Sequence, residues 1–560
     1  MSGSVGSHGA ATYDYIIVGA GSAGCVLANR LTEDGKSTVA ILEAGGRDTS
    51  IFIQMPTALS IPMGMKKYNW CYQTEPEPYL DNRRLNLPRG RVLGGSSSIN
   101  GMVYIRGNAL DYDGWEELGA KGWGYRHVLP YFRRAESRAE GGDTYRGADG
   151  PLHTSYGPMK NPLYSIFVEA ARQAGYSATN DVNGYQQEGF GRMDRTIHRG
   201  RRWSAANAYL KPAMRRHNLD VITEAHVMRI LFRDRRAMAV IYRHGVEERM
   251  IRANREIILA GGPINSPHLL KISGIGPADE LRSFEIPVIA DRPAVGENLQ
   301  DHLEFLFQQA CTQPVTLYSS MNLLSKAIIG IRWILRKDGL GATNHFESCG
   351  FIRSRPGVNY PDIQYHFLPA AITYDGSARL ETHGFQAHVS PMRSKSRGWV
   401  RLVSRDALEA PKVRFNYLSH DDDWIEMRAC VRLTREIFSQ QAFAAFRGEE
   451  LQPGSGYVTD EQIDDFVKRK VESAYHPSGT CRMGDKDSPA SVVDPAGRVI
   501  GVDGLRVADT SIMPQITTGN LNAPAIMIGE KISDCIRGLE ALPPSNAPFF
   551  RASNWKNAQR

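Results

Sequence analysis

The amino-acid sequence predicts an α/β fold whose first parallel sheet is assembled from distant parts of the chain. Residues 13–46 read as a strand, a glycine turn, a helix and a second strand. Far downstream, residues 256–262 form an apolar run of strand length that ends in glycines, and residues 505–509 form another that ends in an aspartate. Both runs are expected to return to the first sheet as further parallel strands, which leaves the segments between them to build a second unit.

Composition and charge exclude several classes of protein. The chain has 560 residues, of which 42% are hydrophobic and 23% charged, so it is globular and not disordered. A net charge of +7 over this length is too dilute to predict a nucleic-acid partner. No run of about 18 apolar residues occurs, so no transmembrane helix is predicted.

The seven cysteines are scattered and contain no CxxC pair, which predicts free thiols, a reducing cytoplasm and no metal site. Residues 1–12 have neither a basic nor an apolar region of a secretory signal and are expected to be a disordered tail. Residues 541–560 are expected to form a C-terminal tail.

The glycine turn after the first strand carries the first chemistry. Gly19 permits a tight turn, Gly21 lets the backbone approach a pyrophosphate, and Gly24 allows the helix to pack closely on the strand. The N-terminus of that helix supplies N–H groups and a partial positive charge. Glu43 ends the second strand, about 20 residues after the last glycine, where its carboxylate can accept hydrogen bonds from ribose hydroxyls. The pattern predicts a dinucleotide site and does not separate FAD from NAD.

A second glycine-rich stretch, RGRVLGGSSSING, covers residues 89–101. Its small residues and hydroxyls suit a loop that wraps a flat, phosphate-bearing ligand. A plain Gly/Ser linker is the alternative, but arginines precede the loop and the apolar and aromatic residues 102–104 follow it.

These motifs, in their order along the chain, resemble the glucose–methanol–choline family of flavoprotein oxidoreductases. The matching stretches are DYIIVGAGSAGCVLANRL, LEAGG, RGRVLGGSSSINGMVYIRG, NGYQQEGFGRMDRT, NHFESCGFIRSR, IQYHFLP, YHPSGTCRMG and SIMPQITTGNLNAPAIMIGEKI. The resemblance extends from Tyr13 to about Arg537. The choline-oxidising members of the family are the most similar.

The resemblance implies FAD rather than NAD, and two interleaved domains. A Rossmann-like FAD-binding domain would use residues 13–155, 222–305 and 490–540. An α+β substrate domain, with an antiparallel sheet under helices, would use residues 156–221 and 306–489.

The resemblance also implies two catalytic residues, His476 in YHPSGT and Asn520 in GNLNAP. A neutral imidazole at 476 would take the hydroxyl proton of an alcohol, and the hydride would pass from carbon to flavin N5. The amide at 520 would donate a hydrogen bond to the developing alkoxide. The implied reaction is the oxidation of a small primary alcohol to the aldehyde.

The implied cofactor contacts are Gly19, Gly21, Ser22, Ala23, Gly24, Glu43, Ala44, Trp70, Arg91, Gly95, Ser96, Asn100, Gly101, Met102, Val103, Val227, Asp509 and Asn522. Some members attach the flavin through a histidine at the position of Ile99. Because isoleucine has no nucleophile, noncovalent FAD is predicted.

The substrate is left open. The choline-acting members are expected to hold the cation with a glutamate and a tryptophan pair, at positions occupied here by Ala310 and by Leu323-Leu324. A small neutral or anionic primary alcohol, such as a hydroxyalkanoate, is therefore an alternative to choline. The candidate substrate residues are His366, Glu347 and Tyr475.

The electron acceptor is open as well, between a quinone of the respiratory chain and O2. Residues 321–337 are apolar at helical spacing and end in basic residues, so they either cover the active site or lie on the inner membrane. Residues 199–202 are expected either to form a solvated basic loop or to help anchor the substrate domain. An NAD-linked enzyme and a flavin-bearing lyase are the competing functions.

Overall fold

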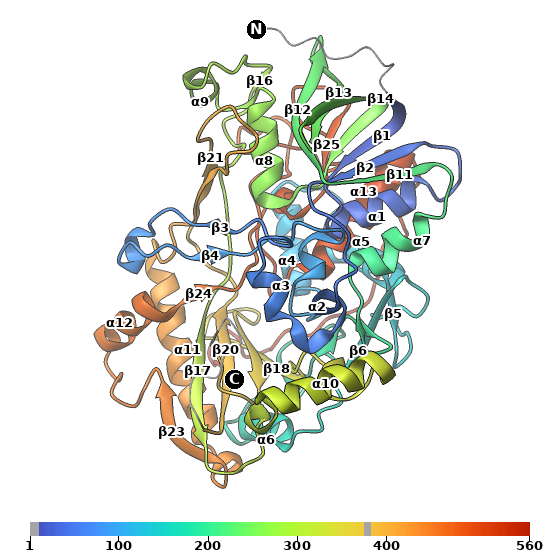
Figure 1. Ribbon diagram of the computed structural model, residues 1–560. Coiled ribbons are helices and arrows are strands. Elements are labelled where there is room, and N and C mark those ends of the chain that lie inside the picture. The colour runs from blue at the N-terminus through green and yellow to red at the C-terminus, as the bar shows by residue number, and fades with distance from the viewer. Residues whose placement is uncertain (1–10, 374–381) are drawn as a thin grey trace.

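The computed structural model describes residues 11–373 and 382–560, and it contains two large sheets with helices packed on them (Figure 1). Of the predicted N-terminal tail, only residues 11 and 12 lie within the described part of the chain. Thr12 already begins the first strand.

The first sheet has a parallel core built from five segments of the sequence. Its strands are β1 (Thr12–Val18), β2 (Val39–Glu43), β11 (Leu219–Thr223), β14 (Glu247–Leu259) and β25 (Leu505–Val507). They run in the order β11–β2–β1–β14, with β25 beside the end of β14. The register places Ile17 between Ile41 and Ile258, so apolar side chains meet across the sheet. The predicted return of residues 256–262 and 505–509 to this sheet is confirmed.

One side of the sheet continues as an antiparallel meander. The N-terminal half of β14 pairs with β13 (Arg236–His244), which pairs with β12 (Ala225–Arg233). The meander widens the sheet without adding to its parallel core.

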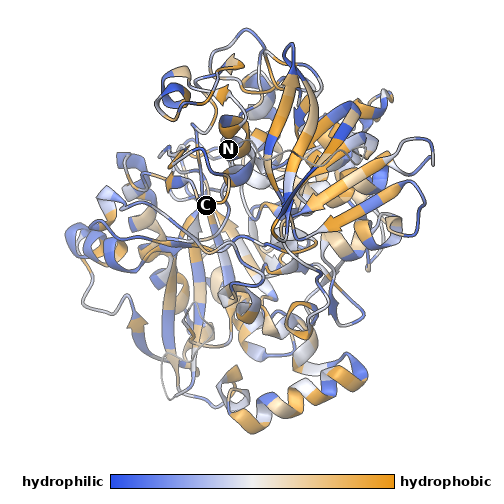
Figure 2. Ribbon diagram, turned by 45° about the horizontal axis from the view of Figure 1, so that its top comes forward, coloured by the Kyte–Doolittle hydropathy of each residue, from blue (hydrophilic) through white to orange (hydrophobic). Residues whose placement is uncertain are grey.

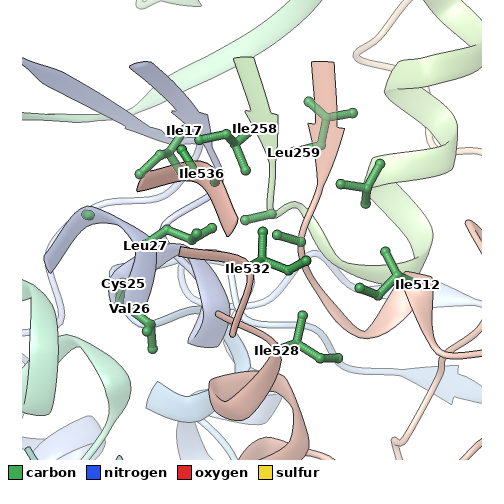
Figure 3. Close-up of a cluster of buried hydrophobic side chains, with 14 of the residues drawn as sticks. Ile17, Cys25, Val26, Leu27, Ile258, Leu259, Ile512, Ile528, Ile532 and Ile536 are labelled. Carbon is green, nitrogen blue, oxygen red and sulfur yellow. The ribbon is translucent and has the colours of Figure 1, made fainter. Parts of the chain in front are cut away.

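Two helices cover the parallel core and meet at its centre. They are α1 (Ser22–Leu31) and α13 (Asn522–Arg537). Figure 3 shows apolar residues of both helices, among them Val26 and Ile532, packed beneath Ile17 and Ile258 of the strands. Burial of these aliphatic side chains stabilises the arrangement at about 25 cal/mol per Å² of apolar surface. The N-termini of both helices are thereby fixed at the carboxyl edge of the sheet.

The second sheet is antiparallel and carries helices, in agreement with the predicted α+β substrate domain. Its order is β23–β17–β20–β19–β18–β7, with β24 beside β17. The strands are β7 (Gly189–Arg192), β17 (Leu303–Cys311), β18 (Ser348–Ile352), β19 (Ile363–Leu368), β20 (Gly384–Pro391), β23 (Arg447–Gln452) and β24 (Glu472–Ser473). Helices α6 (Pro162–Gln173) and α11 (Asp421–Ser439) pack on it through a cluster of aromatic rings that includes Phe167, Phe367 and Phe438.

The remaining elements connect or extend these two units. The helices are α2 (Ile51–Gln54), α3 (Ser60–Gly64), α4 (Ala109–Glu117), α5 (Tyr125–Ala135), α7 (Lys211–Ala213), α8 (Gly262–Ile272), α9 (Ala278–Ser283), α10 (Leu323–Arg336) and α12 (Asp460–Lys470). The short strands are β3 (Tyr72–Gln73), β4 (Asn86–Leu87), β5 (Glu136–Arg138), β6 (Leu152–Tyr156), β8 (Asp194–Arg195), β9 (Ile197–His198), β10 (Arg201–Arg202), β15 (Ile275–Gly276), β16 (Ala290–Asp291), β21 (Trp399–Arg401) and β22 (Lys412–Arg414). Among the described residues, none of the helices is long and apolar enough to cross a bilayer.

The structure corrects the boundaries expected between the two units. The boundary at 221/222 divides β11, which pairs with β2 in the first sheet. The boundary at 305/306 divides β17, which belongs to the second sheet. Residues 541–560 contain no helix or strand but are bound to the body of the protein, for example through the N–H of Phe550 and the carbonyl of Tyr185.

The contact between α1 and α13 predicts the effect of two helical glycine substitutions. A Cβ at Gly529 of α13 would lie 2.9 Å from the Cβ of Val26 and 3.0 Å from the carbonyl oxygen of Ala23. Gly529→Ala is therefore expected to lower the free energy of unfolding in urea by about 1–3 kcal/mol. Gly114→Ala on α4 is the matched control, because a Cβ there meets nothing within 4 Å, and it is expected to raise stability by up to about 1 kcal/mol. Equal effects of the two substitutions would contradict the close packing of α1 on α13.

Candidate active site

One large cavity joins the predicted cofactor residues to the predicted catalytic residues. Its volume is about 1230 Å³, and it runs from the glycine turn to the face of the second sheet. It is larger than the roughly 300–1,000 Å³ that suffices for a drug-sized ligand. The predicted residues that line it are Gly19, Gly21, Ser22, Ala23, Glu43, Ala44, Trp70, Arg91, Gly95, Ser96, Asn100, Gly101, Met102, Val103, Val227, His366, Tyr475, His476, Asp509, Asn520 and Asn522.

Two predicted residues lie outside the lining of this cavity. Gly24 is held against the turn, because a Cβ there would lie 2.0 Å from the carbonyl oxygen of Gly19, so it serves packing, as its place in the motif implies. Glu347, predicted to contact substrate, is buried, and its carboxylate accepts hydrogen bonds from the Met159 N–H at 2.6 Å and the Thr343 hydroxyl at 2.7 Å. The prediction for Glu347 is wrong because its carboxylate already holds two chain segments together.

At the nucleotide end, backbone and helix termini form a cradle. Gly19 has φ +102°, which a residue with a side chain rarely adopts, whereas a Cβ at Gly21 would meet only one atom, at 3.7 Å. Packing therefore does not require glycine at 21, and its absent side chain keeps space in the cavity. The Ser22 hydroxyl donates to Asn522 Oδ1 at 2.8 Å, which joins the N-termini of α1 and α13. Two helix N-termini thus face one cavity, an arrangement that favours a bound anion.

Glu43 ends β2 inside this cradle. Its two carboxylate oxygens accept the N–H groups of Ala20 at 3.0 Å and Gly45 at 2.9 Å. Burial raises the pKa of Glu43 to about 7, and the backbone donors oppose that rise. Each carboxylate oxygen keeps a further lone pair for a hydroxyl donor of a ligand.

The loop of residues 89–103 is held from behind by a buried arginine. Arg202 donates to the backbone oxygen of Asn100 at 2.6 Å, to its side-chain oxygen at 2.9 Å, and to Ile53 O at 2.8 Å. Arg202 is fully buried, so the expectation of a solvated basic loop is wrong for this residue. The same Asn100 side-chain oxygen accepts the N–H of Met102, whose φ of 58° shows a sharp turn. These hydrogen bonds hold the loop in place where it borders the cavity.

These features fit a flavin dinucleotide. The cavity is large enough for a dinucleotide together with a substrate, the helix N-termini suit a pyrophosphate, and Glu43 suits a ribose. The glycine-rich loop and Val227 give the walls that a flat ring system and an adenine need.

At the other end of the cavity, hydrogen bonds fix the orientation of His476. Its backbone N–H donates to Asp301 Oδ1 at 2.7 Å. Tyr475, just before it, has φ 66° and is held there by the Ser473 hydroxyl, which accepts its N–H at 2.9 Å. The Asn520 Nδ2 atom lies 3.0 Å from His476 Nε2.

The proton of His476 is placed by a second histidine that sequence reasoning missed. His302 Nε2 lies 3.1 Å from the carbonyl oxygen of Met392, so Nε2 must carry a proton. Burial lowers the pKa of His302 to about 3, so its Nδ1 keeps a lone pair and accepts from His476 Nδ1 at 3.0 Å. His476 Nε2, which faces Asn520, is then left as an acceptor. Burial also lowers the pKa of His476 well below its usual value, so the imidazole is neutral.

Hydrogen bonds to its side-chain oxygen fix the orientation of the Asn520 amide beside His476. Its side-chain oxygen accepts hydrogen bonds from Gln364 Nε2 at 3.2 Å and from His366 Nε2 at 3.1 Å. Its amide N–H groups therefore point toward His476. A hydroxyl that displaced the direct contact between these two side chains would donate to His476 Nε2 and accept from Asn520.

The cavity also contains a buried carboxylate that the sequence analysis missed. Glu304 of β17 lines it, with 7% of the residue exposed, and its Oε1 lies 3.1 Å from His388 Nδ1. Phe346 packs edge-on against His388, with the ring centroids 5.4 Å apart. Glu304 follows His302 in the short run DHLE, and the alternation of a strand was the signal that would have placed it on an inward face.

The expectation that the cavity lacks a glutamate for a cation is therefore corrected. Ala310, where a glutamate was expected, lies six residues beyond Glu304 on the same strand and outside the cavity lining. Leu323 and Leu324, where a tryptophan pair was expected, are 86% and 72% exposed on α10 and lie outside the lining too. The substitutions at these positions do not remove a negative charge from the cavity.

Comparison with known proteins agrees with this geometry. A family model described as GMC oxidoreductase matches residues 13–304, and its C-terminal counterpart matches residues 394–529. The chain is 56% identical over 547 residues to an oxygen-dependent choline dehydrogenase of Brucella ovis, covering 98% of this chain and 100% of the relative. It is 57% identical over 533 residues to the protein of that name in Rhizobium etli, covering 95% and 97%.

A solved structure extends the likeness to three dimensions. The crystal structure of pyridoxine 4-oxidase from Mesorbium loti superposes with a TM-score of 0.85 at 30% identity, covering 94% of this chain and 100% of that one. Glycine cradle, buried imidazole and two-sheet architecture have the same explanation: the chain belongs to the GMC oxidoreductases, FAD-dependent enzymes that act on the CH–OH group of alcohols.

Proposed function

We propose that this enzyme oxidises a small primary alcohol that carries a cationic group, of the choline type, to the aldehyde. The observation that carries the proposal is the buried carboxylate of Glu304 in the same cavity as the imidazole of His476 and the amide of Asn520. Relatives more than half identical over nearly the whole chain carry the name oxygen-dependent choline dehydrogenase, which supports the same substrate class.

The proposed base is His476 Nε2. The hydroxyl of the alcohol would donate to this nitrogen, and Asn520 would donate to the hydroxyl oxygen as negative charge develops there. Bound FAD supplies the acceptor for the hydride that leaves the carbon bearing this hydroxyl. The contacts of His302 and Asp301 with His476 keep the imidazole at a fixed angle while the proton moves.

The proposed cation site is formed by Glu304 with aromatic side chains. Tyr475 and Phe346 line the same part of the cavity as Glu304 and offer ring surfaces to a trimethylammonium group. The surrounding imidazoles of His366 and His476 are neutral, because burial lowers the pKa of each. A hydroxyalkanoate would bring a second negative charge next to Glu304, which makes it the less favoured of the two substrates.

We further propose that FAD is held noncovalently. Ile99 is buried within the 89–103 loop and has no atom that can form a bond to the flavin ring. The residues proposed to hold the cofactor are those of the glycine turn, Glu43 and the 89–103 loop.

The electron acceptor proposed for this chain is a lipid-dissolved quinone, with O2 as the alternative that the relatives' name supports. Helix α10 carries the structural argument, because it lies along the outside of the molecule with an apolar outer face (Figure 2). The exposed apolar residues are Leu323, Leu324, Ile328, Ile331, Ile334 and Leu335. Lys326 and Ile329 of the same helix line the cavity, so this surface borders the active site.

Basic side chains flank the apolar face of α10. Lys326 and Arg336 are exposed on the helix, and the charges of Lys160 and Arg201 act on the residues that follow it. An exposed apolar helix face with basic neighbours is the pattern that binds anionic lipid.

The substrate class is tested by comparing choline with its neutral isostere 3,3-dimethylbutan-1-ol and with a hydroxyalkanoate, under anaerobic conditions, by the rate of flavin reduction. Choline is expected to have the highest kcat/KM. Glu304→Gln is expected to lower kcat/KM for choline by about 10–100-fold, as for the loss of a charged contact, and to leave the neutral alcohol within a few fold. Preference of the wild-type enzyme for the hydroxyalkanoate would overturn the proposal.

The role of His476 predicts a pH profile. A base must be neutral to accept a proton, and burial keeps the pKa of His476 well below its usual value of 6.5. With the neutral alcohol, kcat/KM should therefore stay constant as the pH is lowered through 6.5 and fall only in more acidic solution. His476→Gln should lower it by about 10²–10⁴-fold. An acid limb centred above pH 6.5 that disappears in this variant would contradict the assigned environment.

The lipid contact is tested by sedimentation with vesicles that contain phosphatidylglycerol. The wild-type protein should bind them at low salt and less at high salt, because surface charge attraction is screened. The triple substitution Leu324→Ser, Ile331→Ser, Leu335→Ser should reduce binding at least tenfold, whereas Val246→Ser, at an exposed turn between β13 and β14, should not. Equal binding of both variants would exclude α10 as the contact.

A further inference from the structure

A chain of hydrogen bonds leads away from Glu304 across the face of the second sheet. Glu304 lies on β17 and His388 on the neighbouring strand β20, where His388 pairs in register with Leu306. The side chains of Glu304 and His388 are 9% and 15% exposed, and both border the cavity. The distance between His388 Nδ1 and Glu304 Oε1 is 3.1 Å. Of the basic side chains in residues 11–373 and 382–560, only that of His388 lies within ion-pair distance of the Glu304 carboxylate.

The residues at the far end of this series of hydrogen bonds determine which nitrogen of His388 carries the proton. Gln386 Oε1 accepts the backbone N–H of Ile372 at 2.9 Å and Gln308 Nε2 at 2.8 Å. A backbone N–H can only donate, so the Gln386 oxygen must point toward Ile372 and its amide nitrogen toward His388. That nitrogen lies 3.1 Å from His388 Nε2, which therefore accepts. The proton of a neutral His388 is then on Nδ1, directed at the carboxylate of Glu304.

The other titratable groups near Glu304 do not take over this role. His366, on β19, lies opposite His388 in register and is neutral, because burial lowers its pKa to about 4. Burial raises the pKa of Tyr475, and its phenol stays protonated. Glu472 of β24 is paired with Arg83 at 2.6 Å. Each of these groups is neutral or already paired, so the donor that faces the carboxylate of Glu304 is His388.

We propose that His388, held in its Nδ1–H tautomer by Gln386, is the positioning residue that orients the carboxylate of Glu304 toward the substrate, and so sets the preference for cationic over neutral alcohols. The inference rests on the proposed function and extends it to a residue that does not itself touch the reacting atoms. A buried carboxylate without a donor takes up a proton, because burial disfavours the charged form. A protonated Glu304 would no longer attract a trimethylammonium group.

The readout is the ratio of kcat/KM for choline to kcat/KM for 3,3-dimethylbutan-1-ol. The two alcohols have the same shape and differ in one positive charge, so changes in the base or in flavin loading cancel in the ratio. His388→Leu is expected to lower the ratio at least tenfold near pH 7, with the neutral alcohol changed by less than threefold. His388→Gln keeps an N–H donor and is expected to restore most of the ratio.

The pH dependence separates positioning from a structural defect. The ratio should change less with pH in the wild-type enzyme than in His388→Leu. In His388→Leu the ratio should rise with pH, because burial without a donor disfavours the charged form of a carboxylate. His244→Gln, on β13 and outside the cavity lining, is the control and should leave the ratio unchanged.

The outcomes distinguish this inference from the proposed function. If Glu304→Gln leaves the ratio unchanged, the cation site itself is wrong. If Glu304→Gln lowers the ratio but His388→Leu does not, or if His388→Leu lowers both substrates equally at every pH, the role of His388 is wrong while the function stands. Should His388→Leu fail to fold, a full ratio in His388→Ala, or a pH-independent loss in it, would overturn the inference in the same way.

Discussion

The proposed mechanism depends on which nitrogen of His476 carries a proton. The carbonyl oxygen of Met392 determines this indirectly, because it requires a proton on Nε2 of His302. His302 can then only accept at Nδ1, so His476 donates to it and keeps its own Nε2 free of a proton. His302 and His476 are 174 positions apart in the sequence, and the second sheet brings them together. A different tautomer would point an N–H at the hydroxyl and could not remove its proton.

Much of the site follows from short contiguous motifs. The glycine turn and Glu43 are predictable because strand, turn and helix follow one another in about 30 residues, and their chemistry depends on that local geometry. His476 and Asn520 were predicted because the stretches that contain them resemble those of the family. The two returning strands at 256–262 and 505–509 were recognisable as buried apolar runs, and both pair with neighbours in the parallel core.

The proposed substrate end of the cavity was harder to predict from the sequence, because its residues come from different strands of an antiparallel sheet. Glu304 and His388 are 84 residues apart, and only the pairing of β17 with β20 makes them neighbours. Ala310 lies on the same face of β17 as Glu304, because side chains alternate, yet it is about 20 Å further along the strand. Sequence alone gives the face of a residue but not its position relative to a cavity, so the resemblance led to Ala310 and missed Glu304.

The surroundings of His476 differ in their charges from other buried parts of the fold. Elsewhere in the fold buried arginines face carboxylates, as Arg146 faces Glu136 at 2.6 Å. Around the base, burial instead keeps the imidazoles of His302, His366 and His476 neutral, since the pKa of each is lowered. If any of these imidazoles were charged, its repulsion would offset the attraction of Glu304 for a cation, because the interaction is strong in a site shielded from water. In the proposed function, the desolvation that keeps the imidazole of His476 neutral therefore also lets the carboxylate of Glu304 select the alcohol.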